Sequence, residues 1–419
     1  MAMESFDVIV IGGGPAGLAA ALKADADGAN VLLVEREARL GGILKQCIHD
    51  GFGLLRFGQK LSGPEYAYRF IEKLPESGIT VSTLTFVTRL TKVAHGVEVT
   101  LVSREGVKTV LGKKLILSTG CRERTSRQIG VHGRHAAGIF TAGTAQHYTN
   151  LLGYLPTKRC VILGSGDIGL IMARRLTLEG AKVLGVYEAK PTPSGLTRNI
   201  SQCLRDFDIP LYLSKTITRV FGEGRLSQVE VSDVDQRMKP IPGTEQCIDC
   251  DALILSVGLI PENELAESLH IPIDNATKGP IVDQRLETML DGVYACGNAL
   301  TVFDLVDYVS ESGETAGRTE RSSPASSRKL IPVETAGDIL SIIPQRIDLN
   351  DLTRPVDFFF RSAQERGGTK LTVSAGGKVL LEKQYRHLRP PEMEKLTVDL
   401  GILAAERPNQ LNVALTEVD

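Results

Sequence analysis

The feature that most constrains this chain is a glycine-rich turn that occurs twice, each time between a strand-like run and a helix-like run. The strand-like runs are FDVIVI at residues 6–11 and RCVIL at residues 159–163, so the two copies lie about 150 residues apart. Continuous apolar runs of this length are typical of buried parallel strands, whose sheets are covered by helices. The repeat therefore predicts an α/β protein with two units of the same kind. Both turns have G-x-G-x-x-G spacing, with glycines at Gly12, Gly14 and Gly17 and at Gly164, Gly166 and Gly169.

This spacing has a mechanical meaning at a nucleotide site. The first glycine permits a tight turn, the second lets a pyrophosphate approach the backbone, and the third lets helix and strand pack closely. In both copies a second strand ends in an acid, Glu35 and Glu188, which follow the last motif glycine by 18 and 19 residues. An acid there can accept hydrogen bonds from ribose hydroxyls. Each unit is predicted to bind one dinucleotide; a turn without a ligand, or a vestigial second site, is the alternative.

The rest of the chain is arranged around these two units. Both close alike, with KLILSTG ending at Gly120 and ALILSVG ending at Gly258. Alternating segments between residues 78 and 112 predict a small antiparallel insertion in the first unit, with Val87 on its first long strand. Beyond a Ser-, Arg- and Pro-rich stretch the pattern has period two, which predicts a β-sandwich-like domain. The predicted domains are 1–121 and 263–320 for a discontinuous first nucleotide-binding domain, 122–262 for the second, 321–330 for a linker, and 331–419 for an all-β domain.

Composition excludes several classes of partner and location. The charges nearly cancel, with 48 Lys and Arg against 50 Asp and Glu, so nucleic acid or an anionic membrane is not expected as partner. No apolar run approaches the roughly 20 residues of a membrane helix. The first residues lack the features of a signal peptide, so we expect a cytoplasmic protein. Seven scattered cysteines favour reduced thiols over a disulfide framework.

Taken together, these residues resemble the two-dinucleotide-binding-domain flavoproteins of the thioredoxin-reductase and glutathione-reductase type, over roughly residues 5–320. The resemblance implies that the first unit binds FAD and the second NAD(H). It also identifies TMLDGVYACGN, which ends at Asn298, as the late segment that passes beside the flavin, with asparagine in place of the usual aspartate. A helix beginning near Asp304 would then direct its positive end toward the flavin.

A narrower resemblance concerns GGILKQCIHDGFGL, STGCRER, GIFTAGTAQ and GSGDIGLIMARRL. These segments are similar to the flavin subunits of heteromeric dehydrogenases, including sarcosine oxidase α, hydrogen cyanide synthase, and opine or proline dehydrogenases. They are most similar to NAD/FAD oxidoreductases that accompany a glycerol-3-phosphate-dehydrogenase-like flavoprotein. The resemblance implies an oligomer with a second flavoprotein, a dehydrogenase, and with a small iron–sulfur protein as a further possible partner.

Motif and resemblance together give a set of candidate site residues. The residues assigned to FAD are Gly12, Gly14, Pro15, Ala16, Gly17, Glu35, Arg36, Gly41, Gly42, Val87, Thr119, Gly120, Gly297 and Asn298. The residues assigned to NAD(H) are Gly164, Gly166, Asp167, Ile168, Gly169, Glu188, Val257 and Gly258.

The cysteines decide whether the electrons pass through a disulfide. Disulfide reductases of the resembling type hold two thiols in one loop, whereas the loop after Gly42 contains only Cys47. Cys47 has three interpretations: its thiol contacts the flavin, it packs without a chemical role, or it is a catalytic thiol. A C-x-x-C pair, Cys247 and Cys250, precedes a strand-like run, and we interpret it as a chance occurrence because the motif alone fixes no redox geometry. No metal-ligand set is apparent.

The sequence thus predicts an FAD-containing, NAD(H)-linked oxidoreductase that passes electrons between nicotinamide and a second acceptor or partner subunit. Two alternatives stay open. The chain could be a free-standing NADH:acceptor reductase of the thioredoxin-reductase type, or a noncatalytic flavin-binding assembly subunit.

Overall fold

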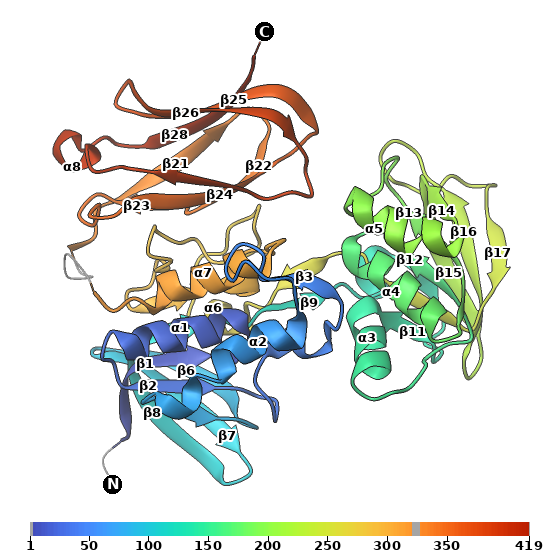
Figure 1. The fold of residues 1–419 in the computed structure, drawn as a ribbon, viewed down its shortest axis with the longest axis horizontal. Helices are drawn as coiled ribbons and strands as arrows, with labels where there is room; N and C mark the ends of the chain where they lie inside the picture. The colour runs from blue at the N-terminus through green and yellow to red at the C-terminus, as the bar shows by residue number, and fades with distance from the viewer. Residues whose placement is uncertain (1–2, 321–326, 419) are drawn as a thin grey trace. The chain divides into compact units, whose positions relative to one another are not determined.

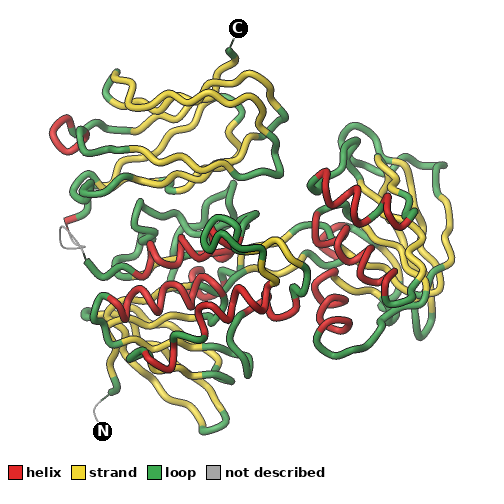
Figure 2. The backbone as a smooth tube through the Cα atoms, in the orientation of Figure 1, coloured by secondary structure: helices red, strands yellow, loops and turns green. Residues whose placement is uncertain are grey.

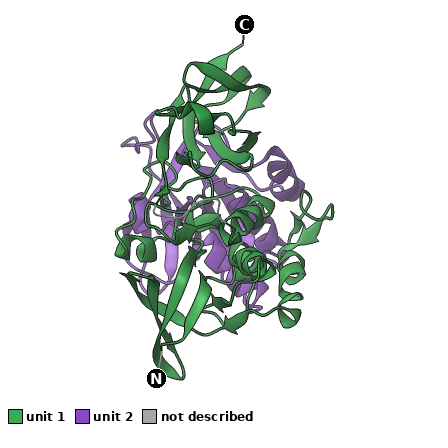
Figure 3. Ribbon diagram, turned by 90° about the vertical axis from the view of Figure 1, so that its left-hand side faces the viewer, with its two compact units in different colours: residues 1–45, 49–121, 261–419 green, residues 46–48, 122–260 purple. Residues whose placement is uncertain are grey.

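The computed structural model describes residues 3–320 and 327–418, which form two compact units. Unit 1 comprises residues 1–45, 49–121 and 261–419, and unit 2 comprises residues 46–48 and 122–260 (Figure 3). Residues 321–326 of the predicted linker lie outside the described residues. No helix of the described ranges is long and apolar enough to cross a lipid bilayer.

A largely parallel sheet forms the centre of unit 1 (Figure 1). Its parallel strands run in the order β5, β2, β1, β8 and β20. The register sets Ile11 opposite both Val34 and Leu117, and Leu117 opposite Ala295, so these strands end at one edge. The bounds are β1 (Ser5–Ile11), β2 (Val31–Val34), β5 (Thr80–Ser82), β8 (Gly106–Leu117) and β20 (Val293–Ala295).

The predicted antiparallel insertion is confirmed. The strands β6 (Phe86–Val93) and β7 (Gly96–Ser103) form a meander with the first half of β8. Two short strands, β3 (Asp50–Phe52) and β4 (Leu61–Ser62), pair before the helix α2 (Gly63–Ile71).

Two helices of unit 1 pack against each other along their length (Figure 1). These are α1 (Pro15–Ala26) and α7 (Val306–Gly317), with α7 beginning two residues later than the predicted start near Asp304. A Cβ atom on Gly313 or Gly317 of α7 would overlap the backbone oxygen of Ala16 or Ala20. The glycines of α7 therefore allow the two helix backbones to approach closely. The remaining helix of this region is α6 (Glu264–Ser268).

Unit 2 repeats the parallel-sheet arrangement. Its sheet has the order β11, β18, β12, β13, β14, and all of these neighbours are parallel. A second sheet, β10, β15, β16, β17, is antiparallel except for its first pair. The helices are α3 (Ala142–Asn150), α4 (Asp167–Leu178) and α5 (Thr197–Cys203). The strands are β10 (His132–Gly133), β11 (Ile139–Thr141), β12 (Arg159–Leu163), β13 (Lys182–Glu188), β14 (Leu211–Leu213), β15 (Lys215–Gly222), β16 (Leu226–Asp233), β17 (Gln246–Asp249) and β18 (Ala252–Leu255). The chain crosses between the units within β9 (Cys121–Glu123) and β19 (Leu259–Pro261), which pair with each other.

The C-terminal part of unit 1 is the predicted β domain, a pair of sheets around its own apolar core (Figure 2). One sheet has the order β23, β21, β28, β25, β26, and the other has the order β22, β24, β27. The SAGGK segment forms a hairpin turn, since Ala375 pairs with Lys378 around Gly376 and Gly377, both of positive φ. The bounds are β21 (Leu330–Ala336), β22 (Ile339–Ile343), β23 (Arg346–Asp348), β24 (Val356–Ser362), β25 (Arg366–Ala375), β26 (Lys378–Leu388), β27 (Glu394–Val398), α8 (Leu403–Glu406) and β28 (Leu411–Glu417).

The β domain is fixed to the rest of unit 1 by apolar and charged contacts. The ring of Phe359 packs edge-on against Phe303 and Tyr308, with centroids 5.3 and 5.2 Å apart. Arg361 forms an ion pair with Asp304 just before α7. Phe359 therefore belongs to the core of the first sheet and helices rather than to the core of its own domain.

Candidate dinucleotide-binding sites

In unit 1 the acid at the end of β2 is held by the glycine-rich turn. Glu35 is only 7% exposed, and its Oε2 accepts a hydrogen bond from the Gly13 N–H at 2.8 Å. Its Oε1 accepts from the Glu37 N–H, also at 2.8 Å. The two bonds fix the carboxylate beside the turn that follows β1, where a ribose next to a pyrophosphate would lie.

Unit 2 reproduces this arrangement with different residue types. Glu188 is 7% exposed, and its Oε2 accepts from the Ser165 N–H at 3.0 Å. Its Oε1 accepts from the Lys190 N–H at 3.0 Å. Ser165 follows the first motif glycine as Gly13 does, and Lys190 lies two residues after the acid as Glu37 does. The duplication seen in the sequence is therefore also a duplication of hydrogen bonds.

The two acids differ in the capacity that remains for a ligand. A carboxylate offers about four acceptor positions. Glu35 uses two in its backbone bonds, which leaves room for a ribose diol. Glu188 also accepts from the Ser165 hydroxyl at 2.6 Å and from the Ser194 hydroxyl at 3.2 Å. Both acids fit an adenosine ribose, but a diol at Glu188 has to displace serine hydroxyls.

Two serines that sequence reasoning missed lie against the glycine-rich turns. Ser118 follows β8, and its hydroxyl donates to the carbonyls of Ile11 at 2.8 Å and Gly12 at 3.0 Å. A Cβ atom on Gly17 would lie 2.6 Å from that hydroxyl oxygen. In unit 2 a Cβ atom on Gly169 would lie 2.8 Å from Cβ of Ser256. The repeated serine of KLILSTG and ALILSVG was the signal for this role.

The helices after the glycine-rich turns have free N-terminal donors. The helices α1 and α4 begin after Gly14 and Gly166, and neither has a side-chain cap among the described residues. Ser62 caps α2 and Thr141 caps α3 through their hydroxyl oxygens, whereas α5, α6 and α7 also lack a side-chain cap among the described residues. Uncapped N–H groups at a helix N-terminus are suited to phosphate oxygens. This fits the binding of a pyrophosphate at both turns.

The Gly-Gly pair at Gly41 and Gly42 lies against the first turn. The Gly41 N–H donates to the Gly13 carbonyl at 2.8 Å, and a Cβ atom on Gly42 would lie 2.9 Å from Cα of Gly14. Gly42 also has a φ of +55°, which favours glycine. Only glycine therefore fits this close approach without displacing the turn.

The late segment at Gly297 and Asn298 is anchored to α7. The Gly297 N–H donates to the Ser312 hydroxyl at 2.9 Å, and the Asn298 Oδ1 accepts from the Phe303 N–H at 3.1 Å. In the first turn of α7, Asp307 is buried, and its Oδ1 has no hydrogen-bond partner in the described part of the chain. A buried acceptor without a partner fits a site that a ligand completes, although its negative charge opposes a further anion there.

Other predicted residues lie around the same two edges. The hydroxyl of Thr119 donates to the Glu262 carbonyl at 2.7 Å. Val87 lies two residues after Thr85, whose N–H donates to the Glu35 carbonyl.

In unit 2, the Oδ1 of Asp167 accepts from the Leu196 N–H at 2.9 Å, so the Asp167 side chain binds the segment that begins α5. Arg36 and Ile168 are exposed, and Gly120 and Gly258 have positive φ. The assignment of these residues to cofactors stays a prediction.

Cys47 lies in the short piece of chain that belongs to unit 2. Its Sγ is 3.8 Å from Oε1 of Gln146 on α3, and the neighbouring Gln46 donates to the Gly143 carbonyl at 2.8 Å. Burial raises the pKa of the Cys47 thiol to about 12. The thiol is therefore protonated at neutral pH, which disfavours the catalytic interpretation. Contact with the flavin stays a prediction.

The two cysteines of the C-x-x-C pair differ in exposure. Each of the seven cysteines, all of which lie in the described ranges, is a thiol rather than half of a disulfide. Cys247 is exposed on β17, whereas Cys250 is buried and its pKa is raised to about 12 by burial.

Comparisons with known proteins cover most of the chain. The model of a family described as pyridine nucleotide-disulphide oxidoreductase matches residues 6–316. Dihydrolipoyl dehydrogenase of Acholeplasma laidlawii is 28% identical over 344 residues, which are 75% of this chain and 95% of that protein. An opine oxidase subunit from Agrobacterium tumefaciens is 23% identical over 352 residues, which are 80% and 68% of the two proteins. The structure of thioredoxin reductase from T. acidophilum superposes with a TM-score of 0.62 at 23% identity, covering 75% of this chain and 97% of that chain.

Proposed function

Because the chain belongs to the pyridine nucleotide-disulphide oxidoreductase family, we propose that it is an NAD(H)-linked flavoenzyme that exchanges electrons with a partner subunit. Members of this family are oxidoreductases that bind FAD and NAD(P)H, and this chain is one of them. When bound, the two cofactors supply the hydride transfer between nicotinamide and flavin.

The observation that carries the proposal is the pair of matched acids. Glu35 would hold the ADP ribose of FAD in unit 1, and Glu188 would hold the adenosine ribose of NAD(H) in unit 2. The uncapped N-termini of α1 and α4 would bind the two pyrophosphates. The charge of Glu188 would oppose a 2′-phosphate, so NADH is the expected nucleotide.

The finer part of the proposal is a place in a heteromeric dehydrogenase of the glycerol-3-phosphate-dehydrogenase-like kind. It is supported by the segments that resemble flavin subunits of such enzymes and by a relative named as a subunit. A cytoplasmic location belongs to the same proposal and is testable by cell fractionation.

The second candidate is a free-standing reductase that acts on a disulfide, in line with the relative named dihydrolipoyl dehydrogenase. The cysteines argue against it, because Cys47 is a single half-buried thiol whose pKa is raised by burial. Of the C-x-x-C pair, Cys247 lies on β17 in the second sheet of unit 2, and Cys250 follows that strand.

The test is an anaerobic titration of the purified flavoprotein with NADH and, in parallel, with NADPH. One equivalent of NADH should bleach the flavin absorbance, and kcat/KM with an artificial dye should be higher for NADH than for NADPH. A chain that binds flavin but is not reduced by either nucleotide would contradict the proposal in favour of a noncatalytic subunit. Equal kcat/KM values would contradict the assignment of Glu188. Rapid NADH-dependent reduction of a disulfide substrate such as lipoamide would favour the second candidate.

A further inference from the structure

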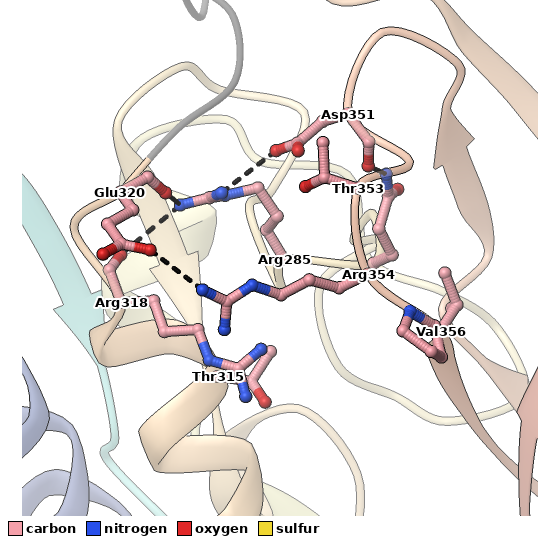
Figure 4. Close-up of a pocket in the computed structure, with 10 residues that line it drawn as sticks. Arg285, Thr315, Arg318, Glu320, Asp351, Thr353, Arg354 and Val356 are labelled. Carbon is pink, nitrogen blue, oxygen red and sulfur yellow. Dashed lines mark hydrogen bonds and ion pairs between the residues drawn. The ribbon is translucent and has the colours of Figure 1, made fainter. Parts of the chain in front are cut away.

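A cavity of about 290 Å³ lies in unit 1 beside the C-terminal end of α7 (Figure 4). Thr315 and Arg318 line it from α7 and the residue after it, and Asp351 and Arg354 line it from the segment before β24. The predicted flavin edge lies at the other end of α7, and a helix of 12 residues is about 18 Å long. The cavity is therefore separate from the predicted dinucleotide site of unit 1.

Three guanidinium groups point toward this cavity, and two of them are paired (Figure 4). Arg285 forms an ion pair with Asp351 at 3.0 Å, and Arg354 forms one with Glu320 at 2.9 Å. Arg318 has no ion pair or side-chain hydrogen bond among the described residues. Among the described residues that line the cavity, three arginines face two carboxylates, an excess of one positive charge in a chain whose formal net charge is −2.

The groups around the Arg318 guanidinium suit the binding of an anion. Burial lowers the pKa of its guanidinium, as do the nearby charges of Arg354 and Arg285, whereas the carboxylates of Glu314 and Asp357 act in the opposite direction. Asp351 and Glu320 balance the charges of Arg285 and Arg354, so Arg318 is the guanidinium without a carboxylate partner among the described residues that line the cavity. The C-terminal end of α7 favours a cation at this position. The Nε of Arg285 is also buried without a hydrogen-bond partner in the described ranges.

We propose that this cavity binds a small molecule through a phosphate group, held by Arg318 and Arg354. Arginine presents paired N–H donors that match the oxygens of phosphate. The Thr315 side chain, which also lines the cavity, adds a hydroxyl donor. The volume is at the lower end of the range of small-molecule sites, which favours inorganic phosphate or a small phosphate monoester over a nucleotide.

The proposal is tested by calorimetric titration of the FAD-loaded full chain with inorganic phosphate and with glycerol 3-phosphate, in chloride buffers of equal ionic strength. Arg318→Gln should raise the Kd at least tenfold, and Arg354→Gln should do the same. The control is Arg134→Gln, because Arg134 is 77% exposed in unit 2 and should leave the Kd unchanged. NADH:dye activity should be equal in all variants, which also shows that each is folded.

The outcomes separate the sources of binding. A lower Kd for glycerol 3-phosphate identifies a monoester as the ligand, and equal values identify free phosphate; both support the site. Binding that persists in Arg318→Gln and disappears with saturating NADH places the anion in the nucleotide site and overturns the proposal. Absence of heat from both ligands up to about ten millimolar also overturns it.

Discussion

Glu35 and Glu188 occupy equivalent positions in the two units and accept equivalent backbone hydrogen bonds. A substitution of either acid is therefore the control for the same substitution of the other. Glu35→Leu removes the acceptor of a ribose diol and leaves hydroxyls unpaired, which costs about 1–3 kcal/mol. We expect the Kd for FAD to rise roughly 5- to 150-fold in Glu35→Leu, whereas the KM for NADH of any loaded enzyme should change little. Glu188→Leu should have the reverse effect. Flavin absorbance after dialysis and steady-state kinetics measure the two. Retention of FAD by Glu35→Leu at the parent affinity would show that the ribose lies elsewhere.

The thiol of Cys47 gives a prediction about reactivity. Because burial raises its pKa to about 12, the thiolate is about 10⁻⁴ of the population at pH 8. Iodoacetamide at this pH should therefore label the exposed Cys247 before Cys47, as read by peptide mass spectrometry. The unfolded protein, in which all thiols are accessible, is the control. Early labelling of Cys47 would mean that its thiol is activated.

The same residue should be dispensable for flavin reduction, since the hydride passes between the two cofactors without a thiolate. Rapid-mixing reduction of Cys47→Ser by NADH should stay within about tenfold of the parent rate. A thousandfold loss with FAD still bound would indicate that the sulfur takes part.

At the scale of elements, the contact between α1 and α7 depends on the absence of a side chain. A Cβ atom on Gly313 would lie 2.9 Å from the carbonyl carbon of Ala16, so Gly313→Ala must separate the helices. Overpacking of this kind costs about 1–3 kcal/mol, which corresponds to a fall in apparent Tm of roughly 2–10 °C. Gly224→Ala is the matched control, because a Cβ atom there meets no atom within 4 Å. Equal melting temperatures of the two variants would contradict the close packing.

The elements that the sequence predicted well are those whose signals are local. The strand, glycine turn, helix and acid of each unit are contiguous, and hence Glu35 and Glu188 could be found by spacing alone. Contacts between distant segments carried no such signal. The predicted all-β domain over residues 331–419 gave no sign that Phe359 packs on Phe303. The predicted first domain over residues 1–121 included Cys47, which lies in unit 2 beside Gln146. Neither partner is near in sequence, and apolar or amide side chains give no hint of which distant surface they meet.

At the scale of the whole molecule, the proposed partner subunit needs a binding surface on this chain. Five large apolar side chains lie between residues 148 and 155, at the end of α3 and just after it, and each is between 38% and 65% exposed. Exposed apolar groups of this density mark sites of protein association. They are Tyr148, Leu151, Leu152, Tyr154 and Leu155.

We expect Leu152→Glu with Tyr154→Glu to abolish co-purification of a partner flavoprotein dehydrogenase and to leave NADH:dye activity intact. Val107→Glu, at another exposed apolar site, is the control and should retain the partner. The isolated parent chain should oxidise NADH with dyes but show no dehydrogenase activity on glycerol 3-phosphate, sarcosine or proline. Turnover of any of these substrates by the chain alone would place the substrate site in this protein.

The packing of Phe359 against Phe303 and Tyr308 limits how far the chain can be truncated from its C-terminus. The family match ends at residue 316, so a cut soon after it would be a natural way to obtain a minimal enzyme. Such a cut would uncover the rings of Phe303 and Tyr308 and would leave Asp304 without Arg361. Newly exposed aromatic surface promotes aggregation in water. The trimmed protein would need polar replacements at these rings to stay in solution, and its failure to do so would say nothing about catalysis.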